Sequence, residues 1–333
     1  MKRLLHTITL LSIILGFSCT HNKKASIGFL LPNLTDGRYP KDRDFFEKKI
    51  TELGGSVEIA DAKNDPQLQE EQANKMISDG VKVIVVCAVN QNLAANIIRK
   101  AHSKGVITIG YERLISNAPL DYFIAFDHYL VGKQQANYAI QKKPTGNYVM
   151  ICGDKTDKNA ELIEKGQMEV ITPLINSGKI KLLYNAAMED WSPIDAQYSI
   201  KKLINLTGEN IDVILCANDG MAGGINLTLD ELLPGNNILV TGLDADLQAC
   251  NRVVNGKQSM TVYKPFKKEA DITAELCWNI LNGKSIKNMT GTISNGSLEI
   301  PTISLQGVVL DISNLKTTLI NDGYLKESDF KNN

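Results

Sequence analysis

The sequence predicts an α/β protein made of two doubly wound, Rossmann-like lobes. Short apolar runs alternate with helical segments along most of the chain, which is the pattern of a parallel sheet covered by helices. The valine-rich run 81–89 is almost continuously apolar, as expected for a strand buried on both faces. The alternation restarts near residue 148, and 333 residues exceed the usual size of one core. Two lobes are therefore expected.

In the first half, glycine and proline mark the helix boundaries. Pro40 suits a first helical turn, and Gly54 and Gly55 suit the end of that helix. The expected strands are 26–32, 57–61, 81–89, 106–111 and 122–127, and the expected helices are 40–53, 66–78, 92–104 and 129–143. This order predicts right-handed crossovers onto one parallel sheet.

The second half repeats the alternation. The expected strands are 148–152, 180–184, 212–217, 238–242, 260–263, 298–305 and 307–312. The expected helices are 158–176, 194–206, 221–233, 266–281 and 315–322, with a further helix-like segment after Asp246. No glycine fingerprint follows the first strand and no P-loop is present, which disfavours a dinucleotide enzyme.

The N-terminus has the pattern of a secretory signal. Met1-Lys2-Arg3 is basic, and residues 4–17 form an apolar run too short to span a bilayer. Cys19 stands where a bacterial lipoprotein signal is cut, although Gly16 replaces the usual leucine. We expect a signal peptide at 1–18 and a lipidated tether at 19–25, so that the lipid is the only membrane attachment. Simple cleavage and a retained anchor are the alternatives.

Composition and cysteines narrow the class of protein further. A formal net charge of −1 does not favour a nucleic-acid surface, which would be basic. The cysteines after Cys19 show neither metal-ligand spacing nor a pairable pattern, and several stand in strand-like apolar runs. We expect buried free thiols at Cys87, Cys152, Cys216, Cys250 and Cys277. No cofactor and no metal site are predicted.

Polar side chains gather where the predicted strands end. Asp244 follows the strand ending at residue 242, and Lys264 follows the next strand, which places an acceptor and a donor side by side at one rim. An aspartate at a strand end is also often a helix N-cap. Both halves of the chain repeat the pattern, with Arg38, Tyr39, Lys41, Glu112, Arg113, Asp154, Asp157, Asn159, Trp191, Asn218 and Asp219.

These groups suit a clamp for a small neutral polyol. Forked polar side chains can bind hydroxyls with two hydrogen bonds, and Trp191 and Tyr39 offer apolar faces to a sugar ring. The alternatives are structural: Trp191 as a packing residue, Asp219 as a helix cap, and Asp42 and Arg43 as surface helix charges or lobe contacts. His21, His102 and His128 are expected to be structural or on the surface, and His6 belongs to the signal.

The sequence does not favour catalysis. It contains no nucleophile elbow with a Ser/His/Asp order and no HExxH motif, and each carboxylate pair has an equally good binding role. We expect a binding protein rather than an enzyme.

As a set, these motifs resemble the D-xylose-binding proteins of sugar ABC transporters, within the type I periplasmic binding-protein superfamily. The resemblance spans about residues 25–330. The segments that carry it are 38–44, 111–113, 157–160, 166–168, 190–193, 217–219, 242–246 and 260–265. It implies sugar contacts at Arg38, Arg113, Asp157, Asn159, Asn218, Asp244 and Lys264, with Trp191 stacking on the ring; Tyr39, Lys41 and Glu112 complete the predicted site.

Three positions depart from the family pattern. Tyr39 replaces tryptophan, Glu112 replaces aspartate, and Lys158 replaces asparagine. A pentose still fits, but the departures leave D-xylose, ribose, arabinose and related aldoses open.

The resemblance also implies the domain organisation. It predicts a three-strand hinge near residues 127–131, 264–266 and 301–304. The N-terminal lobe is then 26–128 plus 266–302, and the C-terminal lobe is 129–265 plus 303–330.

The implied function is capture of a monosaccharide by a monomeric, periplasmic, membrane-anchored lipoprotein for an ABC permease. The alternative is a sugar sensor that docks on the periplasmic domain of a receptor kinase. The effector core of a repressor is disfavoured, because a signal peptide stands where a helix-turn-helix would be.

Overall fold

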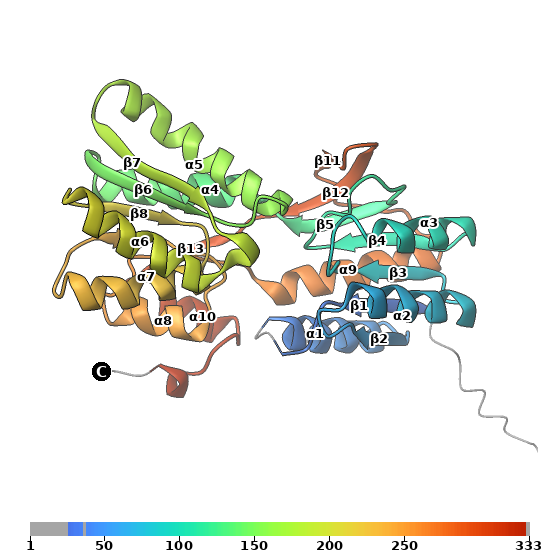
Figure 1. Ribbon diagram of the computed structural model, residues 1–333. Coiled ribbons are helices and arrows are strands. Elements are labelled where there is room, and N and C mark those ends of the chain that lie inside the picture. The colour runs from blue at the N-terminus through green and yellow to red at the C-terminus, as the bar shows by residue number, and fades with distance from the viewer. Residues whose placement is uncertain (1–25, 36–37, 331–333) are drawn as a thin grey trace, which may run out of the picture.

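The computed structural model describes residues 26–35 and 38–330, and the expected signal peptide and Cys19 lie outside them. Two α/β lobes stand next to each other, and each has a sheet with helices on both faces (Figure 1). This architecture confirms the predicted fold class. Within the described residues, no helix is both long enough and apolar enough to cross a membrane.

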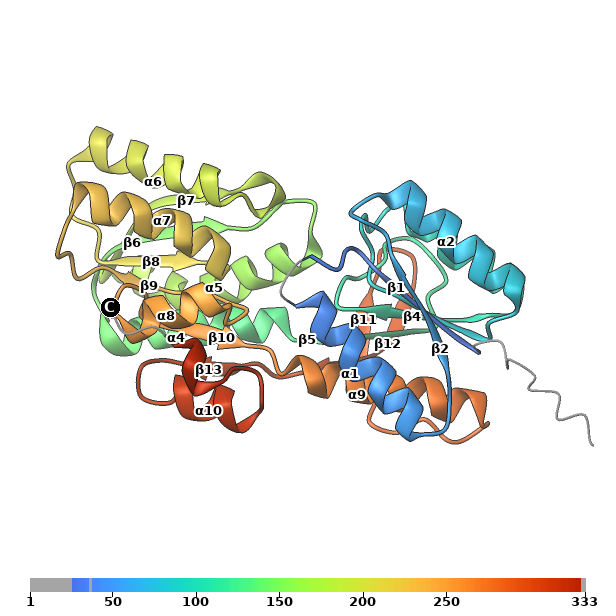
Figure 2. The ribbon, with the colours of Figure 1, turned by 90° about the horizontal axis from the view of Figure 1, so that it is seen from below.

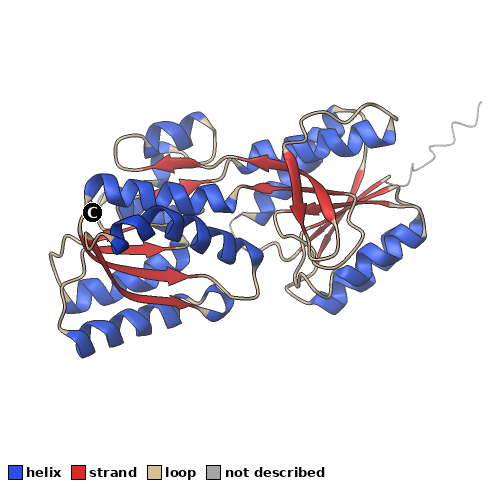
Figure 3. Ribbon diagram, turned by 90° about the horizontal axis from the view of Figure 1, so that it is seen from above, coloured by secondary structure: helices blue, strands red, loops and turns tan. Residues whose placement is uncertain are grey.

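The N-terminal lobe contains a seven-stranded sheet in the order β11-β12-β5-β4-β3-β1-β2. All neighbouring strands are parallel except the β11–β12 pair. Figure 3 shows the strands of both lobes in red, with helices in blue around them. The strands are β1 (Ile27–Leu31), β2 (Val57–Asp61), β3 (Val83–Val86), β4 (Ile107–Tyr111), β5 (Tyr122–Phe126), β11 (Gly291–Ser294) and β12 (Glu299–Leu305). The helices are α1 (Tyr39–Glu52), α2 (Pro66–Asp79), α3 (Ala95–Ser103) and α9 (Phe266–Leu281).

Each face of this sheet buries its own apolar core. Helices α2 and α3 pack on one face, and α1 and α9 pack together on the other (Figure 2). Local chemistry sets the ends of α2: the Asp65 carboxylate accepts hydrogen bonds from the Gln67 and Leu68 amides, and Gly80 ends the helix at φ 96°.

The C-terminal lobe has a four-stranded parallel sheet in the order β7-β6-β8-β9. A single bridge between Leu243 and Val262 links it to the antiparallel pair β10–β13. The strands are β6 (Gly146–Cys152), β7 (Ile180–Ala187), β8 (Val213–Cys216), β9 (Leu239–Val240), β10 (Thr261–Tyr263) and β13 (Val308–Leu310). The helices are α4 (His128–Lys142), α5 (Lys158–Asn176), α6 (Pro193–Thr207), α7 (Asp219–Leu232), α8 (Leu247–Val254) and α10 (Leu315–Asn321), with short 3-10 turns at Glu189–Trp191 and Glu327–Asp329.

The chain passes between the lobes three times. It crosses after β5, again at Lys264 and Pro265 between β10 and α9, and finally at residues 306–307 between β12 and β13. The whole of β12 pairs in the N-terminal sheet, so the last crossing lies a few residues after the range that the sequence suggested.

Most elements agree with the sequence-based expectation, including α5 and α9 at both ends. Strand β11 was not predicted, because its GTIS sequence is short and largely exposed. The five described cysteines are buried and free, as expected.

Candidate functional site

The predicted site residues come from the carboxyl ends of strands in both lobes and from the crossings between them. Arg38 and Glu112 belong to the N-terminal lobe, where they follow β1 and β4. Asp157, Trp191, Asn218 and Asp244 follow β6 to β9 of the C-terminal lobe. Lys264 lies on the second crossing. Parallel strands present their carboxyl ends at one edge of a sheet, which explains why residues far apart in the chain meet here.

Arg38 is the centre of a buried charge cluster. Its guanidinium binds Asp42 through Nε at 2.8 Å, Glu112 through Nη1 at 2.7 Å and Glu269 through Nη2 at 2.6 Å. The ring of Phe266 lies below it, 4.5 Å from the guanidinium carbon to the ring centroid. Arg38 is thus held on three sides and by an aromatic face, which fixes its orientation.

Glu112 connects Arg38 to the crossing. Its Oε1 atom binds both Arg38 and Lys264 at 2.7 Å, and the His128 Nε2 atom lies 3.6 Å away. Although burial opposes ionisation, the charges of Arg38 and Lys264 hold the pKa of Glu112 well below its usual range. Its Oε2 atom is buried and accepts no hydrogen bond from the described residues.

Lys264 and Asp244 meet as the sequence predicted. The Lys264 Nζ atom lies 2.9 Å from Asp244 Oδ1 as well as 2.7 Å from Glu112. The lysine is almost fully buried, whereas 38% of the Asp244 side chain is exposed. Asp246, rather than Asp244, caps the following helix by accepting from the Ala249 amide at 2.6 Å. Asp244 therefore keeps an accessible carboxylate at the edge of the cluster.

On the C-terminal side, Asp157 and Trp191 form a second group. The Trp191 indole donates to Asp157 Oδ2 at 3.3 Å, and Gln91 of the N-terminal lobe donates to Asp157 Oδ1 at 3.0 Å. The indole lies directly over Gly153, where an added Cβ would stand 2.5 Å from ring atoms. Gly153 thus permits the position of the ring.

Asn159 and Asn218 are held by the starts of helices α5 and α7. Asn159 donates to the Glu112 backbone carbonyl of the other lobe at 3.2 Å, and its own amide donates to Asp157. The Asn218 side chain caps α7 by accepting from the Met221 amide at 2.9 Å. The predicted alternative of Asp219 as the cap is wrong; Asp219 is buried and accepts from Gln258 and Thr261.

Arg113 and Tyr39 lie in the N-terminal lobe beside the cluster. Arg113 donates to the Ala88 carbonyl at 3.2 Å. Burial raises the pKa of Tyr39 far above its usual range, so its hydroxyl remains protonated.

Lys41 points elsewhere. Its Nζ atom donates to the Tyr324 carbonyl at 3.2 Å and lies 3.7 Å from the centroid of that ring. Lys41 therefore links α1 to the C-terminal segment and is not one of the groups of the charge cluster. Lys158 is at the surface and pairs with Glu161.

The interpretation of Asp42 as a surface helix charge is wrong. Asp42 is completely buried. One of its carboxylate oxygens accepts from Arg38, and the other accepts from the Tyr111 hydroxyl at 2.7 Å. The expectation does hold for Arg43, which pairs with its exposed neighbour Asp44 at 2.7 Å. His128, expected to be structural or on the surface, is buried beside Glu112.

Backbone strain concentrates at these loops. Glu112, Asp190, Trp191, Asp244 and Ala245 all have positive φ angles, between 49° and 104°. Non-glycine residues adopt this region rarely, and such conformations cluster at functional sites. The surrounding contacts must hold them in place.

The arrangement can bind hydroxyl groups without catalysing their reaction. The partly exposed Asp244 carboxylate lies against the buried Lys264 ammonium, and the Trp191 ring lies beside the Asp157 carboxylate. No group of His, Cys, Asp and Glu in the described ranges is arranged to hold a metal ion.

Sequence reasoning missed two residues of this region, Glu269 and Gln91. Only the position of Glu269, in the first turn after the crossing, hinted at its place.

Comparison with known proteins agrees with this geometry. A family model described as a periplasmic binding protein domain matches residues 27–285. The chain belongs to the periplasmic binding protein family.

Relatives of this periplasmic binding protein cover nearly its whole length. It is 35% identical to the D-xylose-binding periplasmic protein of Haemophilus influenzae, covering 96% of this chain and 97% of the relative. The Escherichia coli protein of the same name is 34% identical, covering 96% of both chains. These relatives are binding proteins, in agreement with the expectation of a non-enzyme.

Solved structures give the same fold. A solute-binding protein of an ABC transporter from Clostridium phytofermentans, with bound β-D-glucose, superposes with a TM-score of 0.85 at 29% identity, covering 92% of this chain and 99% of the other. A carbohydrate-transporter binding protein from Chloroflexus aurantiacus, in complex with D-glucose, also gives 0.85, at 26% identity, covering 92% and 98%.

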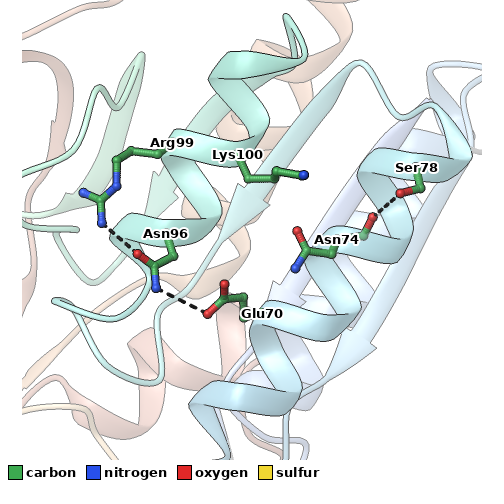
Figure 4. Close-up of a pocket in the computed structure, with 6 residues that line it drawn as sticks. All are labelled: Glu70, Asn74, Ser78, Asn96, Arg99 and Lys100. Atoms are coloured by element: carbon green, nitrogen blue, oxygen red, sulfur yellow. Dashed lines mark hydrogen bonds between the residues drawn. The ribbon is translucent and has the colours of Figure 1, made fainter.

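The periplasmic binding protein also has an open hollow of about 480 Å³ between α2 and α3 (Figure 4). Its lining is polar and hydrogen-bonded locally: Arg99 donates to Asn96 at 2.7 Å, and Asn96 donates to Glu70 at 3.5 Å. None of its lining residues belongs to the predicted sugar site. The hollow is therefore separate from the groups that meet between the lobes.

Proposed function

We propose that this protein binds a monosaccharide, D-xylose or a related aldose, between its lobes and delivers it to an ABC importer. The observation that carries the proposal is the meeting of Arg38, Glu112, Asp244 and Lys264, with one buried Glu112 oxygen left without a donor among the described residues. A sugar hydroxyl would satisfy that oxygen.

Physical chemistry explains why such a cluster suits a sugar. A sugar leaving water must have its hydroxyls bonded again, because an unpaired buried polar group costs about 1–3 kcal/mol. Asp244 and Glu112 supply acceptors, Lys264 and Arg113 supply donors, and Trp191 offers a face to the ring C–H groups. Neutral hydroxyls can use both kinds of partner, whereas an anionic ligand would meet the carboxylates.

Contacts between the lobes support a clamp. Asp157 of the C-terminal lobe receives a hydrogen bond from Gln91, and Asn159 donates to the Glu112 carbonyl. Three chain crossings connect the two bodies, which suits hinge closure around a ligand. The relatives named for D-xylose support a pentose. Tyr39 and Glu112 differ from the family pattern, so related aldoses belong to the proposal.

The proposal includes a periplasmic location with a lipid anchor on Cys19 and a monomeric state. The sequence pattern around Cys19 supports the anchor. Labelling with a palmitate analogue, lost in Cys19→Ala, tests it, and light scattering tests the monomer. The comparisons do not favour the alternative of presentation to a receptor kinase.

The first test is a thermal-shift screen of the purified protein against D-xylose, ribose, arabinose, galactose and glucose. A ligand that binds only the folded state raises the melting temperature by mass action. We expect one pentose to give the largest rise, confirmed by calorimetry.

Xylitol is the control, because it keeps the hydroxyl configuration of xylose at C2 to C4 but cannot close into a ring. It should produce a smaller shift, since Trp191 has no ring to stack on. A flat response to every sugar would contradict the proposed function.

A further inference from the structure

Glu269 is a buried carboxyl group that the sugar site does not directly require. It stands in the first turn of α9, just after the second crossing, and its side chain has no exposed surface. Its Oε2 atom accepts from Arg38 Nη2 at 2.6 Å. The group therefore contacts the residue at the centre of the charge cluster directly.

The charges around it do not balance. Arg38, just before α1, contributes one positive charge and Asp42 on α1 one negative charge; Lys264 on the crossing is positive and Glu112 after β4 is negative. The Tyr111 hydroxyl, His128 at the start of α4 and the partly exposed Asp244 beside Lys264 are the other titratable groups. With Glu269 ionised, three buried carboxylates and Asp244 share two cations.

Hydrogen bonding identifies the carboxyl group that has the weakest support for a negative charge. Both oxygens of Asp42 accept hydrogen bonds, from Arg38 and Tyr111. Glu112 receives two cations on one oxygen. Glu269 accepts only from Arg38, and its Oε1 atom is buried without a partner in the described part of the chain.

We propose that Glu269 is a positioning residue for the sugar site, which holds Arg38 in place as a protonated, neutral carboxylic acid. The inference rests on the proposed function, because Arg38 is a predicted sugar contact. One proton on Glu269 brings the four buried groups Arg38, Lys264, Asp42 and Glu112 to electrical balance, while the charge of Asp244 is partly exposed to solvent. Arg38 then stays directed at Glu112 and the ligand instead of forming a full ion pair on its far side.

Electrostatics support the assignment. Burial, with a further contribution from Glu112 and Asp42, raises the pKa of Glu269 well above its usual range. A carboxyl group whose pKa is raised on folding stabilises the fold at low pH, and this stability is lost as pH rises from the usual glutamate range through the raised pKa. Ionised Glu269 would draw Arg38 into a full ion pair, so the form that binds sugar is the protonated one. Binding therefore takes up a proton only where the free protein has begun to lose it, and sugar affinity should fall as pH rises through the raised pKa of Glu269.

The test variant is Glu269→Gln, which keeps an oxygen to accept from Arg38 but cannot ionise. The control is Glu275→Gln on the same helix, where the carboxylate is 49% exposed and pairs with Lys49 at 2.7 Å. Calorimetry measures the affinity for D-xylose, or for the sugar with the largest thermal shift, from about pH 5 to about pH 9. Wild type and Glu275→Gln should lose about tenfold in affinity, and Glu269→Gln should stay flat. A Glu269→Gln profile parallel to wild type would overturn the proposal.

A second measurement needs no sugar. The infrared difference spectrum between unliganded wild type and Glu269→Gln at neutral pH should show the carbonyl stretch of a protonated carboxyl group, while circular dichroism stays native. Burial also raises the pKa of Asp219, but that group is common to both proteins and cancels in the difference. Absence of the difference band would overturn the proposal. If the band behaves as expected and no sugar binds, the proposed function fails while the protonated Glu269 stands.

Discussion

The two sides of the candidate site are built from different chemistry. On the side of the N-terminal lobe and the crossing, buried charges bind one another, with Arg38 touching three carboxylates and Lys264 touching two. On the C-terminal side, hydrogen bonds from helix starts orient Asp157 and Asn218, and the indole of Trp191 lies over a glycine.

This difference determines which substitutions each side of the site tolerates. A buried ion cluster is balanced as a unit, so losing one member leaves its partners charged and without compensation. On the C-terminal side, the Asp157 carboxylate accepts from neutral donors, one of them a partly exposed ring, so its neutral partners can be replaced one at a time. We therefore expect the N-terminal side to couple sugar binding to stability, and the C-terminal side to affect affinity with little effect on stability.

The largest effect is expected for Arg38→Met. The change leaves Asp42, Glu112 and Glu269 buried with one fewer cation, and should lower the free energy of unfolding by about 3–5 kcal/mol. The loss should shrink at acid pH, where the carboxylates are protonated. Urea unfolding at neutral and acid pH measures both effects.

Arg43→Met is the matched control for Arg38→Met. Arg43 lies in the first half of α1, the helix that follows Arg38, and among the described residues its ion pair is with the exposed Asp44. Its free energy of unfolding should stay within about 0.5 kcal/mol of wild type. If Arg38→Met unfolds at the same urea concentration as this control, the charge cluster does not stabilise the fold and the comparison fails.

An intermediate effect is expected at Trp191. Trp191→Ala should weaken sugar binding about tenfold, because the stacking face is lost, with a smaller change in the melting temperature of the unliganded protein. Gly153→Ala should imitate it without removing the ring, since the new methyl group would stand 2.5 Å from the indole and displace it. Calorimetry measures the sugar affinity, and thermal melting measures the stability of the unliganded protein. Native affinity in both variants would show that the ring does not contact the sugar.

Sequence reasoning could predict the fold because local signals agreed along the chain. The Asp65-Pro66 start and Gly80 end define α2, and the Asp157 cap defines the start of α5. Strand β11 could not be predicted, because it forms through pairing with β12 and buries little of its own surface.

The candidate site could be predicted only in part. Asp244 and Lys264 were paired correctly, since both follow neighbouring strands at the same edge. Asp42 looked like a surface charge, and Glu269 gave no signal beyond its position after the crossing, because their burial depends on α1 packing against α9. Contacts between distant helices leave no local pattern in the sequence.

The smallest effect is expected where the two sides touch. Gln91 donates to Asp157 at 3.0 Å across the lobes, so Gln91→Ala removes one hydrogen bond of the closed arrangement. A bond of this kind contributes about 1 kcal/mol, which predicts a loss of about fivefold in sugar affinity. Each lobe keeps its own core, so urea unfolding of the unliganded protein should change little. Gln67→Ala, on the exposed surface of α2, is the control for the substitution itself. Equal affinities in the two variants would mean that closure does not depend on this contact, and that the two sides of the site are joined by the chain crossings alone.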